Sequence, residues 1–251
     1  MISTSDYDTG FKIDPKLIRK LRSKSGILID QLNSVPIFFV KEDTMDGHCL
    51  SECLERDCTK ETVRNFETDD FRPAKVHHAE EIMKKLENCM RKCNALGCYI
   101  PNADDISEKP HILLCPERIR YRNKNQFNDL LMEVLIHELT HAYFSTGIGL
   151  NDISKHIIEE SLCEAYAFSK LGKNEEIFEF IADHKRPPEY TAFKFWTELS
   201  TQFPLIIPMS DWKNKDYKSF SSLTQLFYYG GFPILNSGYL DVIAMTILSF
   251  S

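Results

Sequence analysis

The pentapeptide His137-Glu138-Leu139-Thr140-His141 is the stretch whose residue types and spacing point most directly to chemistry. Residues four apart on a helix lie one above the other, so the imidazoles of His137 and His141 can be directed at one divalent ion. Glu138 lies one residue along and can reach a water on that ion without binding the metal itself. The pattern indicates metal-assisted hydrolysis.

The residues around the pentapeptide predict a buried helix. Residues 125–129 offer capping and first-turn side chains, apolar residues then recur at helical spacing on two sides, and Gly147 is the expected C-cap. Alternatively, His137 and His141 are satisfied core or surface histidines and Glu138 is a solvated charge. The uncharged neighbours of the pair favour the metal site.

The third metal ligand is expected on the next helix. A catalytic zinc ion usually takes three protein ligands and keeps a fourth position for water. Ser154 can cap a helix that ends near Gly172 and runs antiparallel to the first. On it, Glu160 is the expected ligand, and Glu164, on the same face, is expected to accept the second ring N–H of a zinc-bound histidine. Glu159 should point about 100° away, towards solvent or a neighbouring charge. A solvated acidic face is the alternative.

These residues resemble a known family. HExxH followed by Glu160, nineteen residues beyond His141, is similar to the gluzincin group of zinc metallopeptidases. The resemblance implies zinc ligands His137, His141 and Glu160, catalytic Glu138 and a bracing acid four residues beyond Glu160. Residues 160–166 also resemble the ligand helix of lethal-factor-type gluzincins. Residues 112–115 and 136–143 resemble mitochondrial intermembrane-space peptidases that process an ATP-synthase subunit. The likeness covers about residues 111–172.

The resemblance also suggests further parts of a site. Gluzincins use a Tyr or His from the C-terminal side to stabilise the oxyanion, which makes Tyr190 and His184 candidates, although either can be structural. In peptidases of this kind an edge strand beside the metal pairs with the substrate backbone, and residues 111–115 are the candidate strand. An ordinary internal strand is the alternative. His111 is expected to be exposed at the strand end, and Cys115 to be buried.

The predicted fold is α+β: a mainly helical zincin-like domain with a small sheet whose edge strand lies beside the metal-site helix. Strands are expected at residues 37–40, 98–100 and 111–115, and helices at 16–24, within 49–96, at 174–185 and at 188–201. Residues 1–110 would form an N-terminal helical region with short strands. Residues 111–251 would form the zincin core and a C-terminal helical wall, in one compact unit.

The composition of the chain limits the classes of partner that we expect. The chain has 251 residues, 43% of them hydrophobic, and a net charge of −7 with the two signs interspersed, which argues against a nucleic-acid partner. The first residues do not read as a secretory signal, and the apolar stretch 242–250 is too short to span a bilayer. We therefore expect a cytoplasmic protein with no membrane partner, one zinc ion per chain and a peptide or protein substrate.

The eight cysteines leave two other functions open. Cys-x3-Cys-x4-Cys occurs twice, forty residues apart, and its members could form disulfides, hold a structural zinc or be buried thiols in a reducing compartment. One rival function is therefore a thiol-rich helical adaptor built on a zincin scaffold. The other is a non-catalytic zinc-binding interaction protein whose fourth metal position is closed by Cys115 or Cys163. The repeated cysteines are Cys49, Cys53, Cys58, Cys89, Cys93 and Cys98.

Overall fold

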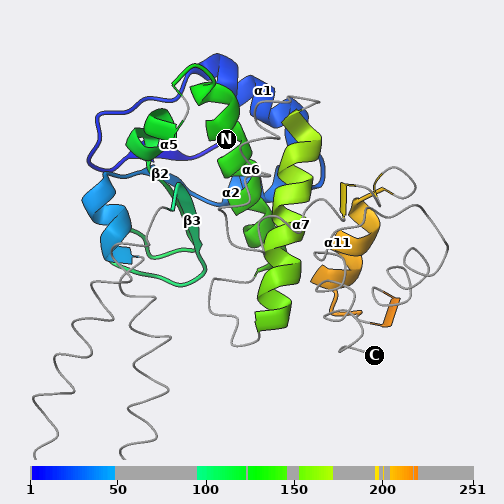
Figure 1. Cartoon of the computed structure of the whole chain (residues 1–251). Helices are drawn as coiled ribbons and strands as arrows, with labels where there is room; N and C mark the ends of the chain where they lie inside the picture. Colours follow the sequence, from blue (N-terminus) through cyan, green and yellow to red (C-terminus); the bar gives the residue numbers. More distant parts are fainter. Residues whose placement is uncertain are drawn as a thin grey trace, which may run out of the picture.

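The computed structural model of the chain describes residues 2–48, 95–122, 124–145, 153–171, 196–197, 200, 204–216 and 218–219, with backbone alone for 153–157. Helices pack against a four-stranded sheet, which confirms the predicted α+β class (Figure 1). Within the described ranges, no helix is long and apolar enough to cross a membrane. The predicted helical segments within 49–96 and at 174–185, the apolar stretch 242–250 and five of the six repeated cysteines lie outside these residues.

The sheet has the strand order β1-β2-β4-β3. β1 (Thr4–Asp6), β2 (Ile37–Phe39) and β4 (His111–Leu114) are parallel, and β3 (Gly97–Ile100) pairs antiparallel with β4. Three of these strands match the predicted ones, and β1 was not predicted. Strands from both sides of residue 110 thus share one sheet.

β4 is an internal strand, so the prediction that residues 111–115 form the edge strand beside the site was wrong. Every residue of β4 is buried, because β2 and β3 cover its two edges and packed side chains cover its two faces. The strand at the edge beside the site is β3. His111 is fully buried, which also corrects its expected exposure.

The alternation of side chains along the strands divides the core into two clusters. Ile112, Leu114 and Tyr99 face the larger cluster, which contains the apolar residues of the helices. Leu113 and Cys98 face a smaller cluster on the other side of the sheet, which includes Cys115 as a buried free thiol. Cys98, the one repeated cysteine that the structure describes, is also a buried free thiol.

The larger cluster is built around α6 (Phe127–Phe144) and α7 (Ile153–Leu171), which lie side by side in Figure 1. α1 (Pro15–Ser25), the short helix η1 (Gly26–Leu28) and α2 (Ile29–Ser34) connect β1 to β2 and pack on α6. α5 (Pro116–Arg122) precedes α6, and α11 (Ile206–Lys213) follows later in the chain. Residues 42–48 are also helical. Almost all of α6 is buried, as expected for a helix that is apolar on more than one side.

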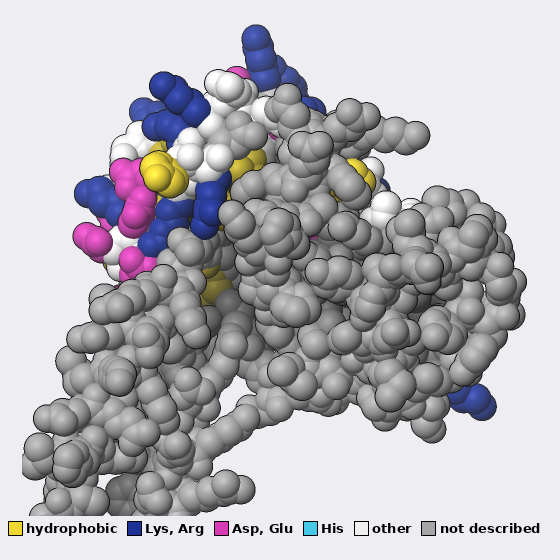
Figure 2. All heavy atoms as spheres, viewed as in Figure 1, with side chains coloured by type: hydrophobic (Ala, Val, Ile, Leu, Met, Phe, Trp, Pro, Cys, Tyr) yellow, Lys and Arg dark blue, Asp and Glu magenta, His cyan; other side chains and the backbone are white. Residues whose placement is uncertain are grey.

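Helix ends account for the placement of α6 and α1. α6 ends at Phe144 because Ser145 takes the left-handed conformation, with φ 57°, so Ser145 and not Gly147 is the C-cap. α1 begins after Asp14, whose carboxylate accepts the Lys16 N–H at 2.8 Å, and ends at Ser25, before Gly26 with φ 54°. Lys and Arg side chains gather at the upper end of the described surface in Figure 2, where α1 lies in Figure 1.

Candidate metal centre

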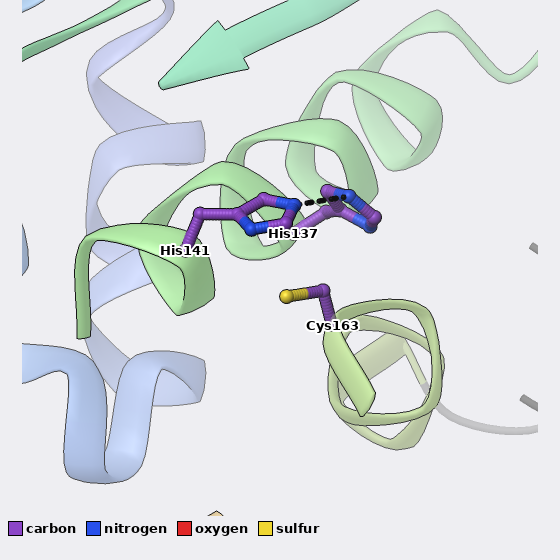
Figure 3. Close-up of side chains that lie close together, drawn as sticks. All are labelled: His137, His141 and Cys163. Atoms are coloured by element: carbon purple, nitrogen blue, oxygen red, sulfur yellow. Dashed lines mark hydrogen bonds between the residues drawn. The ribbon is translucent and has the colours of Figure 1, made fainter. Parts of the chain in front are cut away.

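The two histidines of the pentapeptide lie on one face of α6, as predicted. His137 Nε2 and His141 Nε2 are 3.1 Å apart, and both rings are buried (Figure 3). In an α-helix the side chains of residues i and i+4 stack one above the other, and here this stacking directs the two ring nitrogens at the same point.

Glu160 of α7 places one carboxylate oxygen beside each of the two ring nitrogens. Glu160 Oε2 lies 3.2 Å from His137 Nε2, and Glu160 Oε1 lies 3.4 Å from His141 Nε2. Ligand atoms at tetrahedral positions about 2.0–2.1 Å from one ion are separated by about 3.3–3.4 Å. The two rings and the Glu160 carboxylate therefore lie close enough together to bind one metal ion.

The pairing across the helices shows that α6 and α7 run antiparallel. His141 contacts Glu159 and Glu160, whereas His137 contacts Glu160 and Glu164, so the order along one helix is reversed on the other. The predicted antiparallel hairpin is confirmed. α7 begins at Ile153, one residue before the predicted Ser154 cap, and ends before Gly172 as predicted.

Glu159 braces His141, a role that the helical spacing did not reveal. His141 Nδ1 donates to Glu159 Oε1 at 3.1 Å, and Trp212 Nε1 on α11 donates to Glu159 Oε2 at 3.2 Å. Glu159 is therefore buried against a neighbouring charged group and not directed to solvent. Because Nδ1 carries the proton in this bond, the lone pair of the neutral ring is on Nε2, which faces His137 and Glu160.

Glu164 lies at the other histidine, on the predicted face. Its Oε2 is 3.9 Å from His137 Nδ1, within ion-pair range and longer than a hydrogen bond. Glu133, one turn before His137 on α6, is buried beside the same two residues, with ligand atoms of all three within 4.8 Å of one another. The outer nitrogen of His137 thus faces two carboxylates, and sequence reasoning identified one of them.

Five glutamates are buried around the two imidazoles. Because the burial of several like charges is costly, a divalent cation between the donor atoms would lower that cost. The five acids are Glu133, Glu138, Glu159, Glu160 and Glu164.

The pKa shifts reflect this charge arrangement. Burial opposes ionisation of Glu160, but His141 and His137 outweigh it and hold the pKa of that carboxyl well below its usual range. Burial also disfavours the charged form of His141, yet Cys163 and Glu160 beside it raise its pKa well above the ordinary value. The pKa of Glu138 is raised, mainly by burial. A carboxyl with a raised pKa is suited to accept and release a proton near neutrality.

Glu138 lies against the edge strand β3. Burial raises the pKa of Glu138, and the Tyr99 backbone beside its carboxyl group acts in the opposite direction. A Cβ added to Gly97 would lie 2.7 Å from Val134 Cγ1 and 3.0 Å from Glu138 Cγ, so glycine permits the close approach of strand and helix. Cys115 N–H donates to the Leu96 carbonyl, and along an antiparallel strand residues that bond to the partner alternate with residues whose backbone groups point away from it. Counting from Leu96 along β3, the Tyr99 N–H therefore lies on the edge away from β4.

Cys163 and the two tryptophans also surround the site. Cys163 projects from α7 towards the histidine pair (Figure 3), and burial raises the pKa of its thiol. Both tryptophans of the chain donate their indole N–H groups to α7: Trp196 Nε1 to Ser161 Oγ at 2.8 Å, and Trp212 Nε1 to Glu159. Cys115 packs in the smaller cluster, away from the histidines. The candidate oxyanion donors Tyr190 and His184 lie outside the described residues.

Comparison with known proteins gives no match. No family model fits the chain, and neither a curated protein nor a solved structure is significantly similar to it.

Proposed function

We propose that this protein is a zinc-dependent peptidase with a gluzincin-like site on α6 and α7. The observation that carries the proposal is the close approach of His137, His141 and Glu160: the two Nε2 atoms are 3.1 Å apart, and each lies 3.2–3.4 Å from one oxygen of the Glu160 carboxylate. These three residues would hold one zinc ion. When bound, the ion would supply a Lewis acid for a peptide carbonyl and a water molecule with a pKa lowered towards neutrality.

Glu138 would be the catalytic acid and base. Its carboxylate would take a proton from the attacking water and pass it to the nitrogen of the leaving amine, so that the peptide bond and one water become a carboxylate and an amine. Its raised pKa and its position one residue from a ligand support this role. Glu159 would hold His141 in the tautomer that directs Nε2 inward.

The edge strand β3 would receive the substrate backbone. Among the residues that the structure describes, no strand pairs with the edge of β3 away from β4, and strand addition at such an edge gives affinity through the main chain with modest sequence selectivity. This assigns to residues 97–100 the role that the sequence suggested for residues 111–115.

One observation favours a second function. The position of Cys163 beside His137 and His141 would allow a closed structural zinc site with a thiolate ligand, as in a non-catalytic interaction protein. In that case Cys163→Ala would release the zinc. Under the peptidase proposal, Cys163→Ala keeps both zinc and hydrolysis.

The test of the proposal is hydrolysis of a mixed peptide library by the zinc-loaded chain. Glu138→Gln is expected to keep about one zinc at this site while hydrolysis falls by about 10²–10⁴-fold, the typical contribution of a general base. Glu117→Gln, at an exposed position on α5, is the matched control and keeps full activity. Hydrolysis at the unsubstituted rate in Glu138→Gln would contradict the mechanism.

A further inference from the structure

A second cluster of histidines and acids lies on the face of the sheet opposite α6. His111 of β4 is fully buried, and its Nε2 is 3.3 Å from Asp104 Oδ2 in the loop between β3 and β4. His48, at the end of the helical segment 42–48, brings its Nδ1 to 3.6 Å from the same oxygen. The helical segment 42–48, the β3–β4 loop and β4 thus converge on one carboxylate oxygen.

The outer atoms of this cluster are fixed by backbone groups. Asp104 Oδ1 accepts the N–H groups of Ile106 and Ser107, both at 2.9 Å. His111 Nδ1 lies 2.9 Å from the Lys109 carbonyl, and since a carbonyl only accepts, Nδ1 carries a proton. Donation of the outer ring N–H to a backbone carbonyl is the usual arrangement of a metal-binding histidine.

The inner atoms face each other without a hydrogen-bond partner. Neither His111 Nε2 nor Asp104 Oδ2 makes a hydrogen bond, although both atoms are buried. With Nδ1 protonated, a neutral His111 presents a lone pair at Nε2 to an anionic oxygen, which is repulsive. A positive charge between the two atoms would remove the repulsion and would give each of the two buried atoms a partner.

We propose that His48, Asp104 and His111 form a second site for a divalent transition-metal ion such as Zn²⁺. A proton on His111 Nε2 would satisfy that ring alone. In this cluster, however, the imidazoles of His48 and His111 both approach the same carboxylate, that of Asp104. Asp105 supplies a further oxygen, because ligand atoms of His48, Asp104 and Asp105 lie within 4.8 Å of one another. Imidazole nitrogens with carboxylate oxygens are a donor set that suits zinc.

The metal at this site would link the β3–β4 loop to the helical segment 42–48. A second link already joins this segment to the start of β3, because Arg118 of α5 forms an ion pair with Asp46 at 2.5 Å and donates to the Ala95 carbonyl at 3.3 Å. The inferred role is therefore structural: the ion would hold residues 42–48 against the sheet. It does not depend on the α6–α7 site being catalytic.

Zinc content of the full chain tests the proposal. Protein loaded with Zn²⁺ and freed of excess ion by gel filtration is measured by elemental analysis. Asp104→Asn keeps an oxygen for the Ile106 and Ser107 N–H groups but replaces the inner oxygen with an amide, so it is expected to lose one zinc per chain relative to the unsubstituted protein. His48→Gln, at a half-buried position, is a second variant and is expected to lose the same zinc.

Two further variants make the loss specific. Ser107→Ala alters the same loop without removing a proposed ligand and should keep the full zinc content. His141→Ala should lose a different zinc, so that its combination with Asp104→Asn loses two. Unchanged zinc content in both Asp104→Asn and His48→Gln would overturn the proposal.

Discussion

The two histidine clusters use similar residues but are supported by different parts of the fold. At the α6–α7 site, side chains from helices fix the donors: Glu159 holds the outer nitrogen of His141, and Trp212 holds Glu159. At the other cluster, backbone groups of a turn fix the outer atoms of Asp104 and His111. The first arrangement follows from helical periodicity. The second depends on the conformation of the β3–β4 loop and on the approach of the distant segment 42–48.

The difference matters for chemistry as well. The α6–α7 site has a buried carboxyl with a raised pKa, Glu138, beside the donors and next to β3, an edge strand of the described sheet. The second cluster lies at an internal strand, and its acids are Asp104 and the exposed Asp105. We therefore expect the first site to catalyse and the second to stabilise.

The largest expected effect separates the two clusters by activity. His141→Ala removes a ligand and leaves Glu159 without its histidine, so peptide hydrolysis should fall to background. His48→Ala should leave hydrolysis within about twofold, because His48 lies on the other face of the sheet. Initial rates with the same peptide library measure both. Equal loss of activity in the two variants would show that the clusters do not act separately.

A smaller effect is expected when the brace of His141 is weakened. Glu159→Gln keeps the side-chain size but removes the charge that orients the imidazole, and such changes typically cost 10–100-fold in metal affinity. Competition of Zn²⁺ with a chromophoric chelator measures the affinity. Glu117→Gln is again the control, and an unchanged zinc affinity in Glu159→Gln would refute the bracing role.

Zinc affinity at the α6–α7 site should rise with pH. The pKa of His141 is raised well above its ordinary value, so the metal-free ring keeps its proton to a higher pH than an ordinary imidazole, and zinc must displace that proton. Affinity then gains up to about tenfold per pH unit below this pKa. The stability of the metal-free fold should change with pH in the opposite direction. The stabilisation by His141 is complete below the unfolded-state pKa of its ring, and it is lost as pH rises through the folded-state pKa. Calorimetric titrations at two pH values measure the affinity, and a flat profile would contradict the shift.

The smallest effect concerns the packing of β3 on α6. Gly97→Ala places a methyl group 2.7 Å from Val134 Cγ1, and overpacking of this kind should lower the free energy of unfolding by about 1–3 kcal/mol. Gly47→Ala is the matched control, since its Cβ would meet nothing within 4 Å in a helical segment and should stabilise by up to about 1 kcal/mol. Chemical denaturation measures both, and equal effects would show that β3 does not press on the helix.

Local periodicity predicted the parts of the site that lie on one helix at a time. The stacking of His137 on His141, the facing position of Glu160 and the buried strands followed from spacing alone. The bracing role of Glu159 did not, because it depends on how α7 is rotated against α6 and on Trp212, fifty-three residues away.

Strand order and short elements were not predictable in the same way. β3 and β4 are both short and apolar, and only the parallel pairing of β2 with β4 decides which of them is internal. The sequence predicted that His111 lies at an exposed strand end, yet Asp104, in the loop that follows β3, covers it. β1, α2, α5 and α11 are too short to give a clear periodic signal.

The most direct test of the central claim is anomalous diffraction at the zinc edge from crystals of the zinc-loaded chain. We predict a peak about 2.0–2.2 Å from His137 Nε2, His141 Nε2 and a carboxylate oxygen of Glu160. A chain that holds zinc elsewhere, with no anomalous peak between these three side chains, would contradict the account.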